Sequence, residues 1–175
     1  MAESFRTVRK NTLIIAEEIA EDKYGYSPAP GSRTVAQLLV HMATGTKMPE
    51  QIHRIQHVSD LGTINFFALM GPIAAEEQKP RTKAEIIAVL KESGDSFSGW
   101  LEGVSDEFLA EVVTFPAGMT PATKTRMEML LGAKEHEMHH RGQLMLIQRM
   151  LGGVPHLTRA MQERMAAMQA QSAKV

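Results

Sequence analysis

The 175-residue chain contains no cysteine. Disulfides and thiolate metal ligands are therefore excluded, and any metal site must be built from histidine, aspartate or glutamate, which suits zinc, nickel, iron or manganese. The absence of cysteine also fits a reducing compartment. The chain further lacks the glycine-rich phosphate loops, G-x-S-x-G elbows and Cys–His dyads that would indicate other common kinds of catalytic site.

A surplus of charge of one sign is also missing, because 19 basic and 20 acidic residues give a formal net charge of −1. Such a chain has no electrostatic footprint for nucleic acid. No apolar run approaches the ~20 residues of a membrane span, and the amino terminus carries no basic flank followed by an apolar stretch. We therefore expect a cytoplasmic protein that binds neither nucleic acid nor membrane.

The overall composition of the chain is typical of one soluble globular domain. Hydrophobic residues make up 43% of the chain and charged residues 22%, and the length is that of an ordinary domain with a core of its own. We expect a single domain that spans residues 1–175.

Helical spacing of apolar residues predicts an all-α fold, a four-helix bundle with an additional C-terminal helix. Capping boxes at Thr34 and Thr82 each start a helix, and Thr120-Pro121 supplies an N-cap and a first-turn proline for the longest one. Pro49 should kink or break the second helix. The expected helices cover about residues 3–22, 34–57, 82–103 and 120–151, and the terminal one follows Gly152-Gly153.

Residues 58–80 mix glycine and proline with apolar anchors, which indicates a long connection. We expect this segment to form a lid or a pocket wall, in which Asn65, Phe66, Phe67 and Leu69 close part of a pocket.

Two histidines four residues apart carry the strongest functional signal. His136 and His140 stand one above the other on one face of the longest predicted helix, near the centre of its apolar arc. Both imidazoles can therefore reach a single metal ion. His139 lies about 60° away on the helical wheel, and Glu137 about 100° away at the edge of the apolar arc, so both are poorer inward ligands.

His41 is the third candidate ligand. It shares an inward face of the second helix with Leu38, Gly45, Met48 and Ile52, and Gly45 would leave room beside it. Three histidines without sulfur ligands would leave a coordination position open for water or substrate, as catalytic metal sites do. His53, His57 and His156 fall off these stripes and should be solvated or capping residues.

Two alternatives compete with a mononuclear three-histidine site. Each inward histidine could instead be a buried core residue with a hydrogen-bond partner. The pairs Glu50-x-x-His53 and Glu137-x-x-His140 also match the ligand spacing of dinuclear carboxylate bundles. The dinuclear arrangement would turn Glu50 into the core and expel the apolar residues that share its helix, so we disfavour it.

Two segments resemble the DinB/YfiT-like family of metal-binding four-helix bundles, the DinB superfamily. Residues 26–43 are similar to its proline–glycine turn followed by a capped helix with the first ligand. Residues 136–144 are similar to its H-x-x-x-H-R-G-Q signature. The resemblance implies His41, His136 and His140 as ligands of a divalent metal, zinc or nickel in many relatives, and a homodimer as a common assembly.

The same resemblance implies a small-molecule substrate but does not fix it. Some relatives are thiol S-transferases or isomerases that use a low-molecular-weight thiol, so we expect a metal-dependent enzyme of thiol S-transferase or hydrolase type that activates a thiol or water. Gln143 is placed to hydrogen-bond beside the metal, and Gly142 would permit close helix approach. The alternative is a non-catalytic, metal-stabilised bundle that serves in stress response or partner binding.

Overall fold

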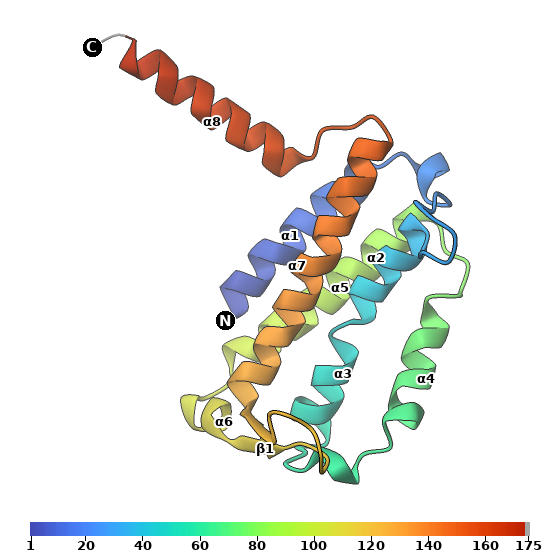
Figure 1. The fold of residues 1–175 in the computed structure, drawn as a ribbon, viewed down its shortest axis with the longest axis vertical. Coiled ribbons are helices and arrows are strands. Elements are labelled where there is room, and N and C mark those ends of the chain that lie inside the picture. Colours follow the sequence, from blue (N-terminus) through green and yellow to red (C-terminus); the bar gives the residue numbers. More distant parts are fainter. Residues whose placement is uncertain (174–175) are drawn as a thin grey trace.

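In the computed structural model, which describes residues 1–173, four long helices form a bundle: α1 (Ala2–Glu18), α2 (Val35–Thr44), α5 (Lys83–Glu102) and α7 (Arg126–Met150). In Figure 1, α1 and α7 run in the same direction, opposite to α2 and α5. The prediction of an all-α four-helix bundle is confirmed.

The first two helices differ from the prediction at their ends. The first stops at Glu18, and the 3₁₀ turn η1 (Glu21–Lys23) follows it. The second breaks at Gly45, before α3 (Lys47–Pro49) and the π-helical η2 (Glu50–Ile55) continue its direction. Pro49 is not the break, because a proline in the first turn of a helix removes no N–H that the helix needs, whereas glycine is a poor helix former.

Capping explains where the helices begin. Thr34 and Thr82 form the predicted capping boxes, with Gln37 and Glu85 as their partners. The longest helix, however, begins at Arg126 and not at Thr120-Pro121. Here β1 (Val112–Thr114) pairs antiparallel with β2 (Thr123–Thr125), and the last residue of β2, Thr125, makes a third capping box with Glu128.

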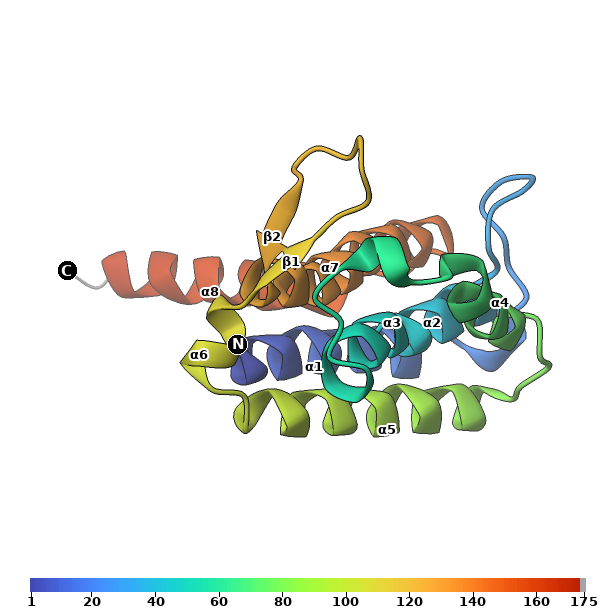
Figure 2. The same ribbon diagram turned by 90° about the horizontal axis from the view of Figure 1, so that it is seen from below.

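The connection between the second and third bundle helices holds the 3₁₀ turn η3 (Leu61–Thr63) and the helix α4 (Phe66–Glu76). Figures 1 and 2 show α4 outside the bundle, beside α2 and α3. None of its residues is buried. The short α6 (Asp106–Ala110), capped by Ser105, precedes β1.

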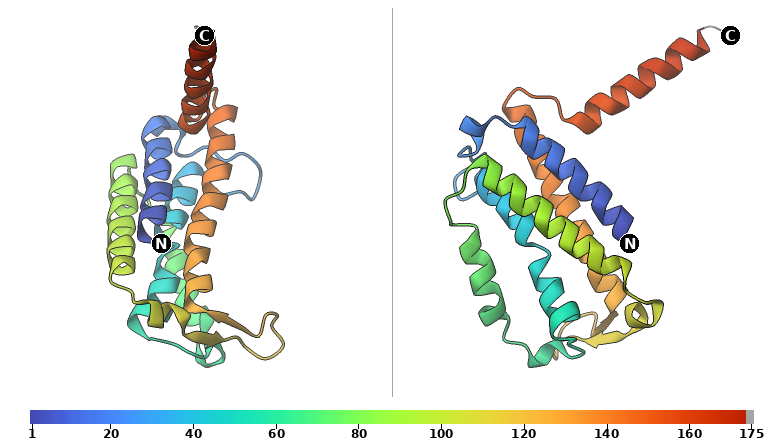
Figure 3. Two further views of the ribbon diagram at one scale, coloured as in Figure 1. Left: turned by 90° about the vertical axis from the view of Figure 1, so that its left-hand side faces the viewer. Right: turned by 180° about the vertical axis from the view of Figure 1, so that it is seen from behind.

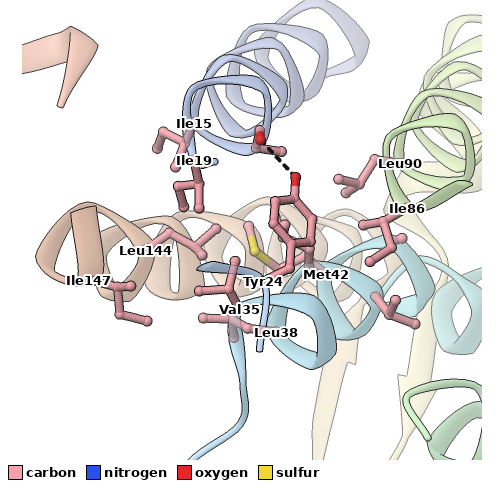
Figure 4. Close-up of a cluster of buried hydrophobic side chains, with 14 residues drawn as sticks. Ile15, Ile19, Tyr24, Val35, Leu38, Met42, Ile86, Leu90, Leu144 and Ile147 are labelled. Carbon is pink, nitrogen blue, oxygen red and sulfur yellow. Dashed lines mark hydrogen bonds between the residues drawn. The ribbon is translucent and has the colours of Figure 1, made fainter. Parts of the chain in front are cut away.

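Apolar side chains fill both ends of the bundle. At one end Tyr24 lies among aliphatic residues of α1, α2, α5 and α7, and its hydroxyl donates to the Ala16 carbonyl at 2.7 Å (Figure 4). At the other end Phe5 and Phe97 meet edge to face, with ring centroids 4.9 Å apart. Three histidines, His41 of α2 and His136 and His140 of α7, lie on the side of the bundle where these two helices meet.

The predicted terminal helix is present as α8 (His156–Ser172), after Gly152 with a φ of 86° ends α7. Figures 1 and 3 show that α8 projects away from the bundle. Its methionines at 161, 165 and 168 are 58%, 45% and 56% exposed, so they do not contribute to the core. Among residues 1–173, no helix combines the length and the apolarity that a bilayer crossing requires.

Candidate metal centre

Three imidazole rings meet between α2 and α7. His41 lies on α2, while His136 and His140 lie four residues apart on α7. The Nε2 atom of His41 is 2.9 Å from that of His136 and 3.1 Å from that of His140. Within residues 1–173, these are the side chains whose possible ligand atoms converge, all within 4.8 Å of one another. We call these three residues the histidine triad; the structure brings together the histidines selected from the sequence.

Gly45, at which the second helix breaks, makes room for the triad because it has no side chain. A Cβ atom at Gly45 would lie 2.8 Å from both Cε1 and Nδ1 of His136, which is closer than real Cβ contacts allow. The expectation that Gly45 leaves space at the site is therefore met, although the space is used by His136 and not by His41. Gly142 has no such role, because a Cβ atom there would meet nothing within 4 Å.

Two of the three rings make a hydrogen bond through Nδ1, on the side that faces away from the centre of the triad. His41 Nδ1 lies 2.7 Å from Oε1 of Glu77, which follows the last residue of α4. His140 Nδ1 lies 2.8 Å from Oε1 of Gln143. Because oxygen accepts in both contacts, each Nδ1 carries the proton and each Nε2 presents its lone pair to the centre of the triad. Gln143 thus acts beside the site as predicted, but on His140.

Glu77 is a residue of the candidate site that the sequence analysis missed. Its other carboxylate oxygen accepts from Nε of Arg33 at 2.6 Å. Burial would raise the pKa of Glu77, but the hydrogen bonds from Arg33 and His41 outweigh it and keep the pKa below its ordinary value. The carboxylate is therefore charged at neutral pH, and it orients His41.

The two imidazoles that α7 contributes to the triad are neutral at neutral pH. Burial lowers the pKa of His136 to about 4, and the neighbouring histidines act in the same direction. Burial also lowers the pKa of His140, although its hydrogen bond with Gln143 opposes the shift. A neutral imidazole with a free Nε2 lone pair is the form that binds a metal.

A buried ion pair lies next to the triad. Arg9 of α1 donates through Nε to both carboxylate oxygens of Glu137 on α7, at 2.8 and 3.0 Å. Its Nη atoms reach the carbonyls of Leu90 on α5 and Met42 on α2. Arg9 is 3% exposed and Glu137 1%. The sequence analysis placed Glu137 at the edge of the apolar arc as a poorer inward ligand, and the structure turns it to Arg9 and not to the triad. Its burial was not foreseen, because the partner inside the core comes from α1.

The same ion pair argues against the dinuclear alternative. Glu137 is turned to Arg9, and the other Glu-x-x-His pair does not reach the triad, since Nδ1 of its histidine, His53, lies 3.0 Å from Nη1 of Arg126. The two Glu-x-x-His pairs therefore do not converge on one dinuclear metal site in this structure.

His53 corrects a further expectation. It was predicted to be a solvated or capping residue, yet it is 1% exposed beside the buried guanidinium of Arg126. His57 is exposed, as predicted. His156 is only partly exposed, and its Nε2 atom lies 3.1 Å from Oδ1 of Asn11. Arg126 explains the error at His53, because its position at the start of α7 depends on the strand β2, which the sequence analysis did not predict.

The environment of His53 predicts an acid-sensitive stability. Burial, followed by the charge of Arg126, lowers the pKa of His53 to about 4, whereas an unfolded histidine titrates near ~6.5. Between these values the unfolded chain binds more protons, so stability falls as the pH falls. The unmodified protein loses free energy of unfolding between pH 7 and pH 5, and we expect this loss to be about 2 kcal/mol smaller in His53→Asn. Urea unfolding at both pH values measures the difference.

The control for this experiment is His57→Asn, four residues away and exposed. It should retain the full acid sensitivity, and asparagine tolerates the positive φ of 48° at this position. Equal pH dependence in the His53 variant and the unmodified protein would contradict the assignment.

Two cavities adjoin the triad. A polar cavity of about 720 Å³ reaches His140 and is lined by Arg33, Gln37, Gln78 and Gln143, among others. A largely apolar cavity of about 480 Å³ reaches His41 and His136. The triad therefore lies between a polar and an apolar space, both large enough for small molecules.

The predicted pocket wall lies in the right segment but uses other residues. The apolar cavity is lined from α4 by Met70, Ile73 and Ala74. Of the four residues expected there, Phe67 is 93% exposed and Asn65 caps α4, while Phe66 and Leu69 pack against a small cluster next to the β-hairpin. The sequence did not show which face of α4 is turned to the bundle, because apolar residues occur around the whole helix.

Comparisons with known proteins agree with this architecture. The family model of the DinB superfamily matches residues 4–144. The protein YjoA of Bacillus subtilis is 25% identical over 148 residues, which is 85% of this chain and 86% of YjoA. Its crystal structure, described as that of a DinB-like protein, superposes with a TM-score of 0.64 at 24% identity, over 87% of this chain and 92% of that one.

A second structure, YfiT from Bacillus subtilis, has a TM-score of 0.66 at 15% identity and covers 87% of this chain and 86% of its own. YfiT is described as a probable metal-dependent hydrolase with an unusual four-helix bundle topology. At this identity the likeness concerns the fold. On the match over residues 4–144, this chain belongs to the DinB superfamily.

Proposed function

We propose that the histidine triad holds one divalent cation and that the chain is a metal-dependent enzyme. The observation that carries the proposal is the convergence of the three Nε2 atoms. Because the Nδ1 atoms of His41 and His140 donate outward, their Nε2 lone pairs face each other at 3.1 Å. A single proton would satisfy one such contact and leave the third nitrogen without a partner, whereas a cation accepts all three lone pairs.

Three imidazoles without sulfur suit several divalent first-row ions, and zinc or nickel is the choice that membership of the DinB superfamily favours. Bound there, such an ion would lower the pKa of water or of a thiol and so provide a nucleophile at neutral pH. The ligands are neutral and the nearby Glu77 charge is matched by Arg33. The site thus retains its positive charge and favours an anionic reactant.

The cavities support an enzyme of thiol S-transferase or hydrolase type. The polar cavity at His140 could admit a hydrophilic thiol or water, and the apolar cavity at His136 could admit the group that is attacked. A non-catalytic, metal-stabilised bundle is the competing proposal. It is less well supported, because a purely structural metal site is closed by its ligands, whereas this one adjoins two cavities.

Turnover assays test the enzymatic proposal. Zinc- or nickel-loaded protein should accelerate thiol transfer to an apolar electrophile, or hydrolysis of an apolar ester or amide, above the uncatalysed rate. His41→Ala should abolish the acceleration, and His139→Ala, which changes a neighbouring exposed histidine, should retain it. No acceleration by fully metal-loaded protein with any tested thiol or hydrolysable substrate would leave the non-catalytic role as the better account.

Gly45 offers a test of the site geometry. In Gly45→Ala the new methyl group would displace the ring of His136, so we expect metal affinity to fall by about 10–100-fold, the range seen when support for a ligating histidine is lost. Isothermal titration with zinc measures the change. Gly142→Ala is the matched control on α7, where a methyl group meets nothing within 4 Å; an equal loss in both variants would argue against the proposed crowding.

Glu77 offers a separate test. Glu77→Ala removes the acceptor that fixes the tautomer and orientation of His41, and metal affinity should again fall by about 10–100-fold. The neighbouring Glu76 pairs with Lys79 and Arg81, away from the triad. Competition with a metal-binding dye should therefore find Glu76→Ala unchanged, and unchanged affinity in Glu77→Ala would show that His41 does not depend on this carboxylate.

A further inference from the structure

A second apolar cavity lies beyond the one at the triad. We name the 480 Å³ cavity at His136 the inner cavity. The outer cavity, of about 390 Å³, lies toward the β-hairpin and has only apolar side chains in its lining, among them Leu61, Phe66, Phe115 and Met119. No charged or hydrogen-bonding side chain lines it, so it has no means of holding a polar group.

The two cavities are adjacent, because Met48, Ile52 and Met129 line both of them. These three side chains form the partition between the cavities. Ile52 is buried, but Met48 is 37% exposed and Met129 is only partly buried. Methionine is unbranched and adapts its shape to its neighbours. The two methionines of the partition can therefore change their shape by rotation of side-chain bonds.

Helix α4 contributes apolar side chains to the inner cavity that the protein covers only in part. Helix α4 has the sequence FFALMGPIAAE, yet none of its residues is buried. Met70, Ile73 and Ala74 face the inner cavity. Exposed apolar surface of this kind marks a binding surface, and an apolar ligand in the inner cavity would cover it.

We propose that the inner and outer cavities form one channel for the straight apolar tail of an amphiphilic ligand, whose metal-binding head group lies at the histidine triad. The position of the head group rests on the proposed function; the position of the tail does not. The ligand class is a molecule with an unbranched alkyl or acyl chain and an anionic or neutral oxygen or sulfur head. The cavity at His140 suits the tail less well, because Gln37, Gln78 and Gln143 line it beside its apolar residues, whereas the outer cavity has only apolar side chains in its lining.

The test uses two series of probes with straight chains of increasing length and the intact, zinc-loaded protein. One series carries a metal-chelating head, as alkyl hydroxamic acids, and the other a weakly coordinating head, as primary alkanols. Each methylene that enters the channel should strengthen binding by about fourfold. In the unmodified protein this gain should continue beyond the chain length that fills the inner cavity.

Met129→Trp places a bulky ring at the partition, so the gain per methylene should end at a shorter chain. Met127→Trp is the matched control two residues earlier on α7, where the side chain is 48% exposed and outside both cavities. Met48→Trp blocks the partition from the opposite side and should act as Met129→Trp does. If Met129→Trp does not fold, Met48→Trp takes its place in the comparison.

The outcomes separate the channel from the metal site. A gain per methylene in both series, shortened by the partition variants and not by Met127→Trp, supports the channel. The same result with hydroxamates no tighter than alkanols still supports the channel but counts against the metal site. Hydroxamates that bind tightly with no gain per methylene, or a gain that the partition variants leave unchanged, overturn the channel and leave the metal site standing.

Discussion

Glu137→Ala should lower the free energy of unfolding by about 3–5 kcal/mol, because it leaves the guanidinium of Arg9 buried without its counter-ion. Arg9 is 3% exposed and ties α1 to three other helices through Glu137, Leu90 and Met42. Gly94 also leaves space for its stem, since a Cβ atom there would lie 2.7 Å from Cγ of Arg9. Urea unfolding of the metal-free protein measures the loss without a contribution from the metal.

Glu135→Ala is the matched control for this experiment, because Glu135 is an exposed residue on the same helix. Its effect should stay within about 0.5 kcal/mol. Replacing both members of the pair by apolar residues, as in Arg9→Met with Glu137→Leu, should recover much of the stability. A loss below about 1 kcal/mol in Glu137→Ala would mean that Arg9 reaches water and that the pair is not a buried link.

His136→Ala should weaken metal binding by more than about 100-fold, since loss of a ligand costs more than loss of a residue that orients one. The remaining imidazoles, His41 and His140, come from different helices and offer only two nitrogen atoms. In the unmodified protein, metal at about 1,000 times its dissociation constant should add about 4 kcal/mol of stability. At the same metal concentration, that stabilisation should fall to about 1.4 kcal/mol or less in the variant, as measured by melting curves with and without chelator.

His139→Ala is the control, because His139 is exposed, its ring packs on that of His140, and its Nε2 atom lies 3.3 Å from Nε2 of Gln143, outside the triad. It should keep both the metal and the stabilisation. Undiminished metal content in His136→Ala after dialysis would contradict the triad. Equal melting curves for metal-loaded and metal-free unmodified protein would contradict the coupling between binding and folding.

The sequence was sufficient to predict the helical bundle and to select the three histidines that the structure brings together. Helical periodicity and the capping boxes at Thr34 and Thr82 depend on neighbours in the chain, so they can be read locally. The facing of His136 and His140 follows from their spacing on one helix. The start of α7 was misplaced because Thr120-Pro121 and Thr125-x-x-Glu128 are competing start signals, and only the pairing of β1 with β2 decides between them.

The residues that support the triad could not be found in this way. Glu77 reaches His41 across 36 positions of the chain, and no periodicity relates the end of α4 to α2. Arg9 and Glu137 carry charges that neither helix could bury by itself, and each is tolerated in the core because the other is there. Buried polar pairs of this kind depend on tertiary contacts that a single sequence does not reveal.

The central claim is that one divalent metal ion binds among the three Nε2 atoms. Anomalous X-ray diffraction from crystals of the zinc-loaded protein, recorded at energies on both sides of the zinc absorption edge, tests it most directly. We predict one anomalous peak per chain, within bonding distance of Nε2 of His41, His136 and His140. Zinc bound only elsewhere, for example at His139 or His53, or no peak at the triad in crystals shown to contain zinc, would contradict the claim.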